Sequence, residues 1–243
     1  MLSAPEKSRQ VWLVLNGGWR CPAFSKLVLG LSLIVWGGQS ALAHSPARLL
    51  RQEPGAEERR EAEQRLWDLG YWAGPVDGKF DANSRHALIA FQKVEGRKRT
   101  GILTRAELKA LQSASPPSPR EEGYAHLEVD LSRQVLFVVD AGGAVTRILP
   151  VSTGNGRSYI DHGEVHRATT PRGNFKVLRK INGWRKSSLG LLYYPNYIVD
   201  GVAIHGSASV PAYPASHGCI RIPMFAAKEL SQQAPVGTVV VLY

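Results

Sequence analysis

The chain contains 243 residues, of which 44% are hydrophobic and 24 are glycine, a composition typical of one or two compact domains and not of a disordered chain. Its formal net charge is +10, which favours an anionic partner. The sequence has no basic helix with interleaved aromatic residues and no helix-turn-helix, zinc-finger or aromatic RNA-binding signature. We therefore expect no nucleic-acid partner, and the excess charge suits attraction to a polyanionic surface.

Residues 1–43 have the three parts of a secretory signal peptide. Arg20 and Lys26 precede an uncharged apolar run at 27–36, and Ala41-Leu42-Ala43 supplies the small residues of an A-x-A cleavage site. We expect cleavage after Ala43. The alternative is an uncleaved anchor, which would be the only membrane attachment, but the apolar run is shorter than the ~20 residues that a span needs.

The cysteines are informative once this segment is removed. Cleavage would take Cys21 and leave Cys219 alone, so no internal disulfide is possible. A single thiol in an oxidising compartment is a liability unless it is used. The alternative is a buried structural cysteine, but the polar, glycine-containing setting of Ser216-His217-Gly218-Cys219 argues against that.

Residues 57–112 show the pattern of three short helices around a small core. Apolar residues recur at helical spacing in the first helix, and Gly70 follows it as a C′ residue. We expect Asn83 or Ser84 to cap the second helix. Thr104 begins a capping box that opens the third.

These residues also carry a family pattern. Its members are Leu66, Leu69, Gly70, Tyr71, Gly74, Asp77, Gly78, Lys79, Phe80, Ala87, Phe91, Gln92, Gly101, Thr104, Leu108 and Leu111. As a set they resemble the peptidoglycan-binding type 1 domain, which implies attachment to the cell-wall polymer. The alternative is a generic helical module in which the same residues only form the core.

The chain divides into a polar lead-in at 44–56, the helical domain, a linker at 113–123 that is rich in proline and serine, and a second domain at 124–243. The second domain has strand-like runs at 126–129, 134–139, 144–151, 174–177, 197–199, 202–205 and 238–243. Asp200-Gly201 predicts a hairpin turn, and Pro223 opens one late helix. We expect a multidomain α + β protein: a three-helix bundle followed by a mainly β sandwich or barrel-like domain.

A histidine and the cysteine lie at predicted strand ends. The hairpin puts His205 at the far end of one strand, and Cys219 begins another. If the two ends meet at one rim, the imidazole can take the thiol proton and return it to a leaving amine. Backbone N–H groups around Gly218 and Cys219 can receive an oxyanion, because glycine lets the backbone approach closely. The pattern predicts acyl transfer by a Cys-His pair.

Ile204-His205-Gly206 followed by Ser216-His217-Gly218-Cys219-Ile220-Arg221 resembles the signature of the YkuD-type L,D-transpeptidase catalytic domain. Supporting segments lie at 150–154, 170–175 and 211–216. The resemblance implies that Cys219 is the nucleophile and His205 the general acid/base.

The resemblance also implies roles for the neighbours of this pair. The carbonyl of Gly206 would orient the imidazole, and His217 and Gly218 would help frame the oxyanion site. Arg221 and Ser216 would hold the site or the substrate. Independently of the resemblance, Tyr193 lies in the segment between predicted strands, where we expect it to line the cleft; packing in the core or in a lid is the alternative.

The reaction implied by the resemblance uses tetrapeptide stems of peptidoglycan as donor and acceptor. Cys219 would attack the carbonyl of the third stem residue, release the terminal D-alanine and pass the acyl group to an amine of a second stem, giving a 3→3 cross-link. Water as acceptor would make the enzyme an L,D-carboxypeptidase. No metal or organic cofactor is implied. The site of action would be the periplasm or the cell wall.

The sequence also allows a metal site, a different cysteine transpeptidase and a non-enzymatic wall-binding protein. His162 and His166 are four residues apart, but they lack a helical pattern, so we expect a solvated loop and not a metal site. A second alternative is a sortase-like transpeptidase. It would pair a cysteine after a Thr-Leu-type strand with a distant arginine, and Ser216-His217-Gly218-Cys219 does not match that pattern. A wall-binding protein with an inert second domain is the non-enzymatic alternative.

Overall fold

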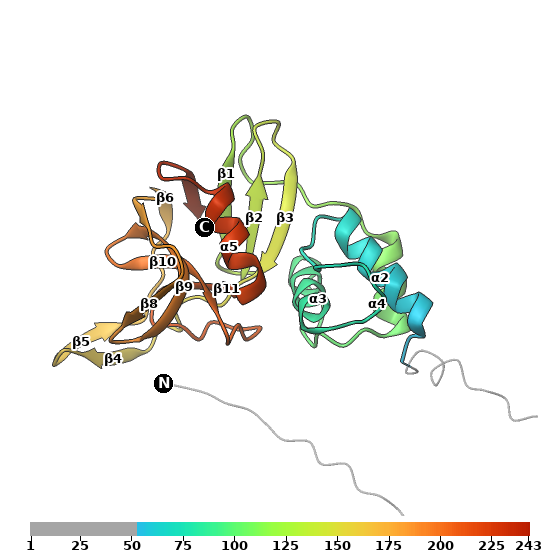
Figure 1. Cartoon of the computed structure of the whole chain (residues 1–243), viewed down its shortest axis with the longest axis horizontal. Helices are drawn as coiled ribbons and strands as arrows, with labels where there is room; N and C mark the ends of the chain where they lie inside the picture. Colours follow the sequence, from blue (N-terminus) through green and yellow to red (C-terminus); the bar gives the residue numbers. More distant parts are fainter. Residues whose placement is uncertain (1–52) are drawn as a thin grey trace, which may run out of the picture. The chain divides into compact units, whose positions relative to one another are not determined.

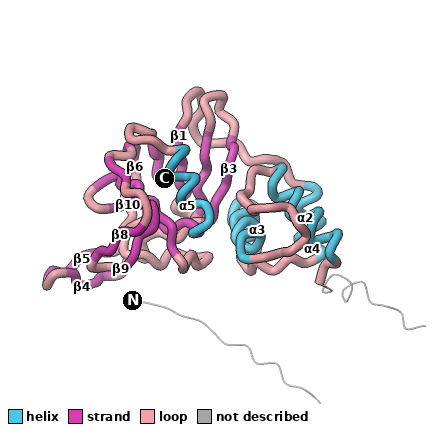
Figure 2. The backbone as a smooth tube through the Cα atoms, viewed as in Figure 1, coloured by secondary structure: helices cyan, strands magenta, loops and turns pink. Residues whose placement is uncertain are grey.

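The computed structural model describes residues 53–243, and the predicted signal peptide and most of the polar lead-in lie outside the described residues. Helices come first, strands follow, and one helix lies near the end of the chain (Figures 1 and 2). The helices are α2 (Ala56–Asp68), α3 (Ala82–Val94), α4 (Arg105–Ser113) and α5 (Met224–Gln233). The strands are β1 (His126–Asp130), β2 (Val135–Val139), β3 (Val145–Pro150), β4 (Ser158–Asp161), β5 (Glu164–Arg167), β6 (Gly173–Lys176), β7 (Arg179–Lys180), β8 (Trp184–Ser187), β9 (Gly190–Val199), β10 (Val202–Ser207), β11 (Ile220–Pro223) and β12 (Val239–Leu242).

The cap of α3 differs from the prediction. The helix begins at Ala82, so Asp81 is the N-cap, and its carboxylate accepts hydrogen bonds from the amides of Asn83 and Ser84. The expectation that Asn83 or Ser84 caps the helix is wrong. The hydroxyl of Ser84 instead donates to the buried carboxylate of Glu63 at 2.9 Å.

The second domain contains two larger sheets and a separate hairpin. The strand order is β3-β2-β1-β12-β6 in the first sheet and β11-β10-β9-β7 in the second, where β8 also pairs with β9. Strands β4 and β5 form the hairpin. A core of aliphatic side chains lies between these elements and α5, including Ile204, Ile220, Ile222 and Leu230. The predicted fold class, a helical module followed by a mainly β domain with a late helix, is confirmed.

The short strands β4, β5, β7, β8 and β11 were not among the predicted runs, except that Cys219 was expected to begin a strand; β11 begins one residue later. The turn between β9 and β10 is as predicted. Asp200 and Gly201 have φ values of 38° and 82°, the left-handed conformation that two-residue hairpin turns require.

The helical module and the first sheet share a hydrophobic cluster. Phe91 and Leu88 of α3 belong to the same cluster as Phe137 of β2 and Ile148 of β3. The backbone of Ile148 also bonds to the segment after α2, because its amide donates to the carbonyl of Gly70 at 2.8 Å and its carbonyl accepts from Trp72 at 3.1 Å. The helical module therefore covers β3, one of the two edge strands of the first sheet.

Candidate functional site

The register of two parallel strands brings the predicted histidine and cysteine to one face of the second sheet. Strand β10 pairs with β11 so that Ile204 lies opposite Ile220 and His205 opposite Arg221. Since side chains alternate along a strand, the two isoleucines face the core under α5, where both are fully buried. His205 and Arg221 consequently share the other face. Cys219, which precedes β11, lies on that face too, because it packs against Ala203 of β10.

His205 is held in one orientation. Its side chain is 5% exposed, and its Nδ1 lies 2.9 Å from the carbonyl oxygen of Gly206. A carbonyl can only accept, so Nδ1 carries the proton and Nε2 keeps its lone pair. Burial lowers the pKa of His205, the positive charge of Arg221 lowers it further, and the bond to Gly206 opposes both. The imidazole is therefore a neutral base at neutral pH.

Cys219 is partly buried beside Ala203, Leu192 and Tyr197. Its thiol contacts the carbonyl oxygen of Gly201 at 3.8 Å. Burial raises the pKa of Cys219, while a hydrogen bond from the backbone of Ala203 and the charge of Arg221 lower it. Burial is the largest of these effects, so Cys219 rests as a thiol and His205 as a neutral imidazole.

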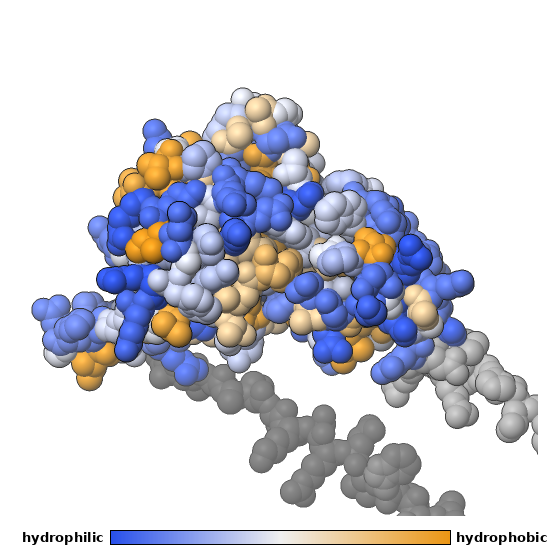
Figure 3. All heavy atoms as spheres, viewed as in Figure 1, coloured by the Kyte–Doolittle hydropathy of each residue, from blue (hydrophilic) through white to orange (hydrophobic). Residues whose placement is uncertain are grey.

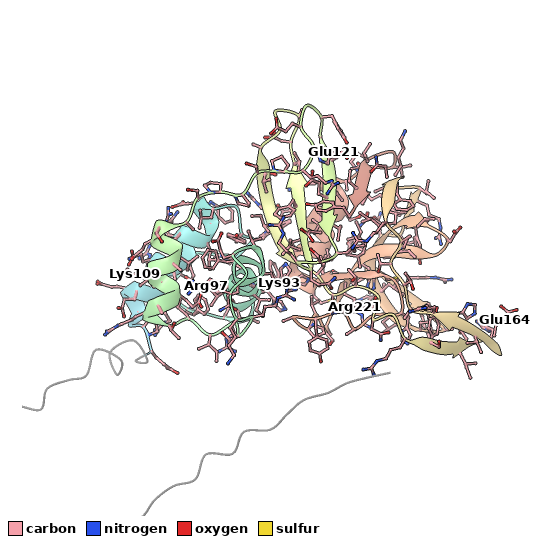
Figure 4. The ribbon with its side chains drawn as sticks, turned by 180° about the vertical axis from the view of Figure 1, so that it is seen from behind. Lys93, Arg97, Lys109, Glu121, Glu164 and Arg221 are labelled. Carbon is pink, nitrogen blue, oxygen red and sulfur yellow. The ribbon has the colours of Figure 1, made fainter. Side chains whose placement is uncertain are left out.

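Arg221 is anchored through its backbone. Its amide and carbonyl pair with the carbonyl and amide of Ser152 at 3.0 and 3.1 Å. In Figure 4 its side chain lies at the second sheet. Its position opposite His205 supplies a fixed positive charge to the face that carries the thiol.

The loop before Cys219 is braced internally. The hydroxyl of Ser216 donates to the carbonyl of Cys219 at 2.5 Å and accepts from the amide of Gly218 at 3.0 Å. Ser216 is buried, so the structure does not support the expectation that its hydroxyl binds substrate. Gly218 has a φ of 143°, and a Cβ there would lie 3.2 Å from the carbonyl oxygen of Thr169. The amide of Gly218 is thus already bonded to the hydroxyl of Ser216.

Sequence reasoning missed Thr170, which joins two segments around this loop. Its hydroxyl donates to the carbonyl of Gly218 at 2.6 Å and accepts from the amide of Gly154 at 2.9 Å. Gly154 is tightly enclosed, because an added Cβ would lie 2.4 Å from the carbonyl oxygen of Ala168. The only sequence signal was that both residues lie in segments that resemble the family, without an assigned role.

His217 is exposed and touches the β4–β5 hairpin. Its ring meets that of Tyr159 edge-on with centroids 4.7 Å apart, and Tyr159 in turn stacks on His166. The hairpin presents Ile160 and Val165, each 73% exposed, and Figure 3 shows an apolar patch at this end of a mainly hydrophilic surface. The segment that contains His162 and His166 is exposed, but it is a paired hairpin and not the loop that we expected.

Tyr193 lies away from the thiol. Tyr193 pairs with Gly206. Because side chains alternate along β10, Gly206 lies on the same face as Ile204, under α5, and Tyr193 packs against the core there. A Cβ on Gly206 would lie 3.2 Å from the Tyr193 ring and 2.7 Å from Cβ of Ala227. The packing alternative is therefore the one that the structure supports for Tyr193, and Gly206 has no room for a side chain.

In residues 53–243, no group of three or more histidine, cysteine, aspartate or glutamate side chains is arranged to hold a metal ion. In the same range, no helix is both long enough and apolar enough to cross a membrane.

Family models match both domains. Residues 124–242 match the L,D-transpeptidase catalytic domain (YkuD), and residues 55–111 match the putative peptidoglycan-binding domain PG_binding_1. A comparison with curated proteins found no match.

One solved structure agrees with this assignment at high similarity. The crystal structure of the L,D-transpeptidase (residues 123–326) from Xylanimonas cellulosilytica is 38% identical, with a TM-score of 0.73, over 82% of this chain and 100% of that one. An L,D-transpeptidase from Stackebrandtia nassauensis is 23% identical over 80% of this chain and 95% of the other, with a TM-score of 0.46.

Proposed function

The chain belongs to the L,D-transpeptidase family, and from that premise we propose that Cys219 and His205 carry out acyl transfer between stem peptides of peptidoglycan. The observation that carries the proposal is that Cys219 packs against Ala203, which alternates with Ile204 on β10 and therefore shares the face of His205. The bond from Nδ1 of His205 to Gly206 supports it, because it leaves Nε2 as the base.

In the proposed first half-reaction, Nε2 of His205 takes the thiol proton as Sγ of Cys219 attacks the carbonyl carbon of the third stem residue. The tetrahedral intermediate collapses when the imidazolium gives that proton to the nitrogen of the terminal D-alanine, which leaves as the free amino acid. The enzyme is left as a thioester at Cys219.

In the second half-reaction, the side-chain amine of a neighbouring stem attacks the thioester carbonyl. Nε2 accepts a proton from that amine and returns it to the departing sulfur, which restores the thiol and completes a 3→3 cross-link. Attack by water would release a tripeptide stem instead. Each step needs a neutral imidazole at its start, which agrees with the lowered pKa of His205.

Negative charge on the intermediate would be stabilised by backbone amides of the loop 217–219. The amide of Gly218 is bonded to Ser216, so we assign this role to the amides of His217 and Cys219. Arg221 would stabilise the developing thiolate and attract the carboxylate of the donor stem, because it lies on the same face and its charge lowers the pKa of Cys219.

We further propose that residues 1–43 direct export and that the helical module holds the enzyme on the wall polymer. Peptidoglycan is the substrate that both matched domains imply, and it lies outside the cytoplasm. The free amine of a stem, as opposed to water, is the acceptor that we propose.

The test is mass spectrometry of the products formed from a defined disaccharide tetrapeptide. We expect a dimer that has lost one D-alanine, together with free D-alanine. The Cys219→Ala variant should form neither, while it still sediments with insoluble peptidoglycan. Undiminished dimer formation by that variant would refute the proposal, and a tripeptide product without a dimer would assign the carboxypeptidase reaction.

A further inference from the structure

A lysine of the helical module is buried against the catalytic domain. Lys93, in the last turn of α3, is 1% exposed, and its Nζ donates to the carbonyl oxygens of Gln134 at 2.9 Å and Val151 at 2.8 Å. Figure 4 shows it on α3, toward the strands. No described carboxylate forms an ion pair with it. Because burying an amine without a counter-ion is costly, its two hydrogen bonds are important for the interface.

The two carbonyls belong to residues that are themselves joined. The amide of Val151 donates to the same Gln134 oxygen at 2.9 Å. The side chain of Gln134 forms two hydrogen bonds with Thr153. Its Nε2 donates to Oγ1 of Thr153 at 2.7 Å, and its Oε1 accepts from the amide of Thr153 at 3.0 Å. Gln134 has a φ of 63°, an uncommon conformation for a residue other than glycine. The ammonium of Lys93 therefore fixes a strained turn and the segment that the turn holds.

That segment leads directly to the nucleophile loop. Ser152 exchanges both backbone bonds with Arg221. The carbonyl of Thr153 accepts from the amides of Ala215 and Ser216, each at 2.9 Å. A continuous set of hydrogen bonds thus runs from Lys93 through residues 151–153 to both sides of Cys219.

We propose that Lys93 is a positioning residue for the thiol: through its bonds to Gln134 and Val151, the wall-binding module holds the loop that carries Cys219 in its reactive geometry. This inference rests on the proposed role of Cys219 as nucleophile. Lowering of the Lys93 pKa to about 7 by burial, with a smaller effect of Arg99, agrees with an amine that is kept at the interface for its hydrogen bonds. Either protonation state can donate both of them.

The test uses the full chain and Lys93→Met, which keeps an unbranched stem but removes the donors. The matched control is Ile148→Val, a loss of one methylene in the same shared cluster without loss of those bonds. All variants are compared at a temperature at which circular dichroism shows them folded. We expect Lys93→Met to lower kcat for tetrapeptide dimerisation about tenfold, a size typical of lost positioning, with KM and sedimentation with peptidoglycan unchanged. Ile148→Val should keep the wild-type kcat.

Hydrogen exchange is a second readout that does not depend on turnover. The amides of Ser152, Ser216 and Arg221 should exchange faster in Lys93→Met and at the wild-type rate in Ile148→Val. If Lys93→Met does not fold, Lys93→Gln, which keeps an N–H donor group on a shorter, uncharged side chain, should show the same changes to a smaller degree.

The outcomes separate the two proposals. A wild-type kcat with unchanged exchange in Lys93→Met, or equal losses in Ile148→Val, would overturn the positioning role. Failure of the folded wild-type chain to release D-alanine would instead refute the proposed function, and the exchange rates would still decide whether Lys93 controls the loop.

Discussion

His205 and Arg221 occupy opposite positions on the parallel strands β10 and β11, so a cation faces the same side of the sheet as the imidazole and Cys219. The charge of Arg221 lowers the pKa of both groups. It therefore favours a neutral base and an accessible thiolate together, which is the combination that nucleophilic attack by a neutral Cys-His pair needs.

Replacement of Arg221 by methionine should shift both limbs of the pH profile of kcat/KM upward. The acid limb reports deprotonation of His205 and the alkaline limb reports deprotonation of Cys219, and loss of the cation raises both pKa values. The measurement is D-alanine release as a function of pH. Arg221→Lys keeps the charge and should leave the limbs close to their wild-type positions; limbs that stay in place in Arg221→Met would show that the guanidinium does not act on the pair.

Alkylation of Cys219 should be slow in the resting enzyme. Because burial raises its pKa, the thiolate fraction at pH 7 is below that of an exposed cysteine, and iodoacetamide reacts with the thiolate. In a Cys21→Ser background, we expect slower labelling in the folded protein than in the same protein unfolded in urea. Faster labelling of the folded protein would mean a preformed thiolate–imidazolium pair. Slow labelling therefore does not indicate an inert second domain, and turnover has to decide that question.

Thr170→Val should destabilise the protein by about 1–3 kcal/mol, because it leaves the amide of Gly154 and the carbonyl of Gly218 without their shared partner. D-alanine release should fall at the same time, since Gly218 immediately precedes Cys219. Thr170→Ser, which keeps the hydroxyl, is the control. Urea unfolding measures the first effect, and a free energy of unfolding equal to that of the wild type would contradict it.

Lys93 should make stability depend on pH in the neutral to mildly alkaline range. Its pKa is about 7 in the folded protein against an ordinary value of 10.5, so between these values the unfolded chain binds more protons than the folded one. The free energy of unfolding should therefore rise as the pH increases above 7. When the pH is lowered again through about 7, this gain in stability should be lost. Urea titrations from pH 7 to 8.5 measure the slope.

Lys93→Met is the control for this dependence. It removes the titrating group, so its free energy of unfolding should change less with pH than that of the wild type over the same range. Parallel slopes for the two proteins would show that the amine does not titrate there.

The order of the domains, the turn at Asp200-Gly201, the late helix and the Cys-His pair that we propose for the chemistry could all be predicted from the sequence, because they follow from local periodicity, turn chemistry and a motif of adjacent residues. The family resemblance also implied the bond between His205 and Gly206, which joins neighbours in the chain.

The other features could not be predicted from the sequence, because they depend on contacts between residues far apart in the chain. The face on which Tyr193 lies follows from strand register, the inward-turned hydroxyl of Ser216 from the geometry of its loop, and the raised pKa of Cys219 from burial. Thr170 acts on Gly218 across 48 residues, and Lys93 reaches Val151 across 58. Such hydrogen bonds cannot be predicted from a local sequence pattern, because they form, and stabilise the protein, only when folding brings the two groups together and removes water from between them.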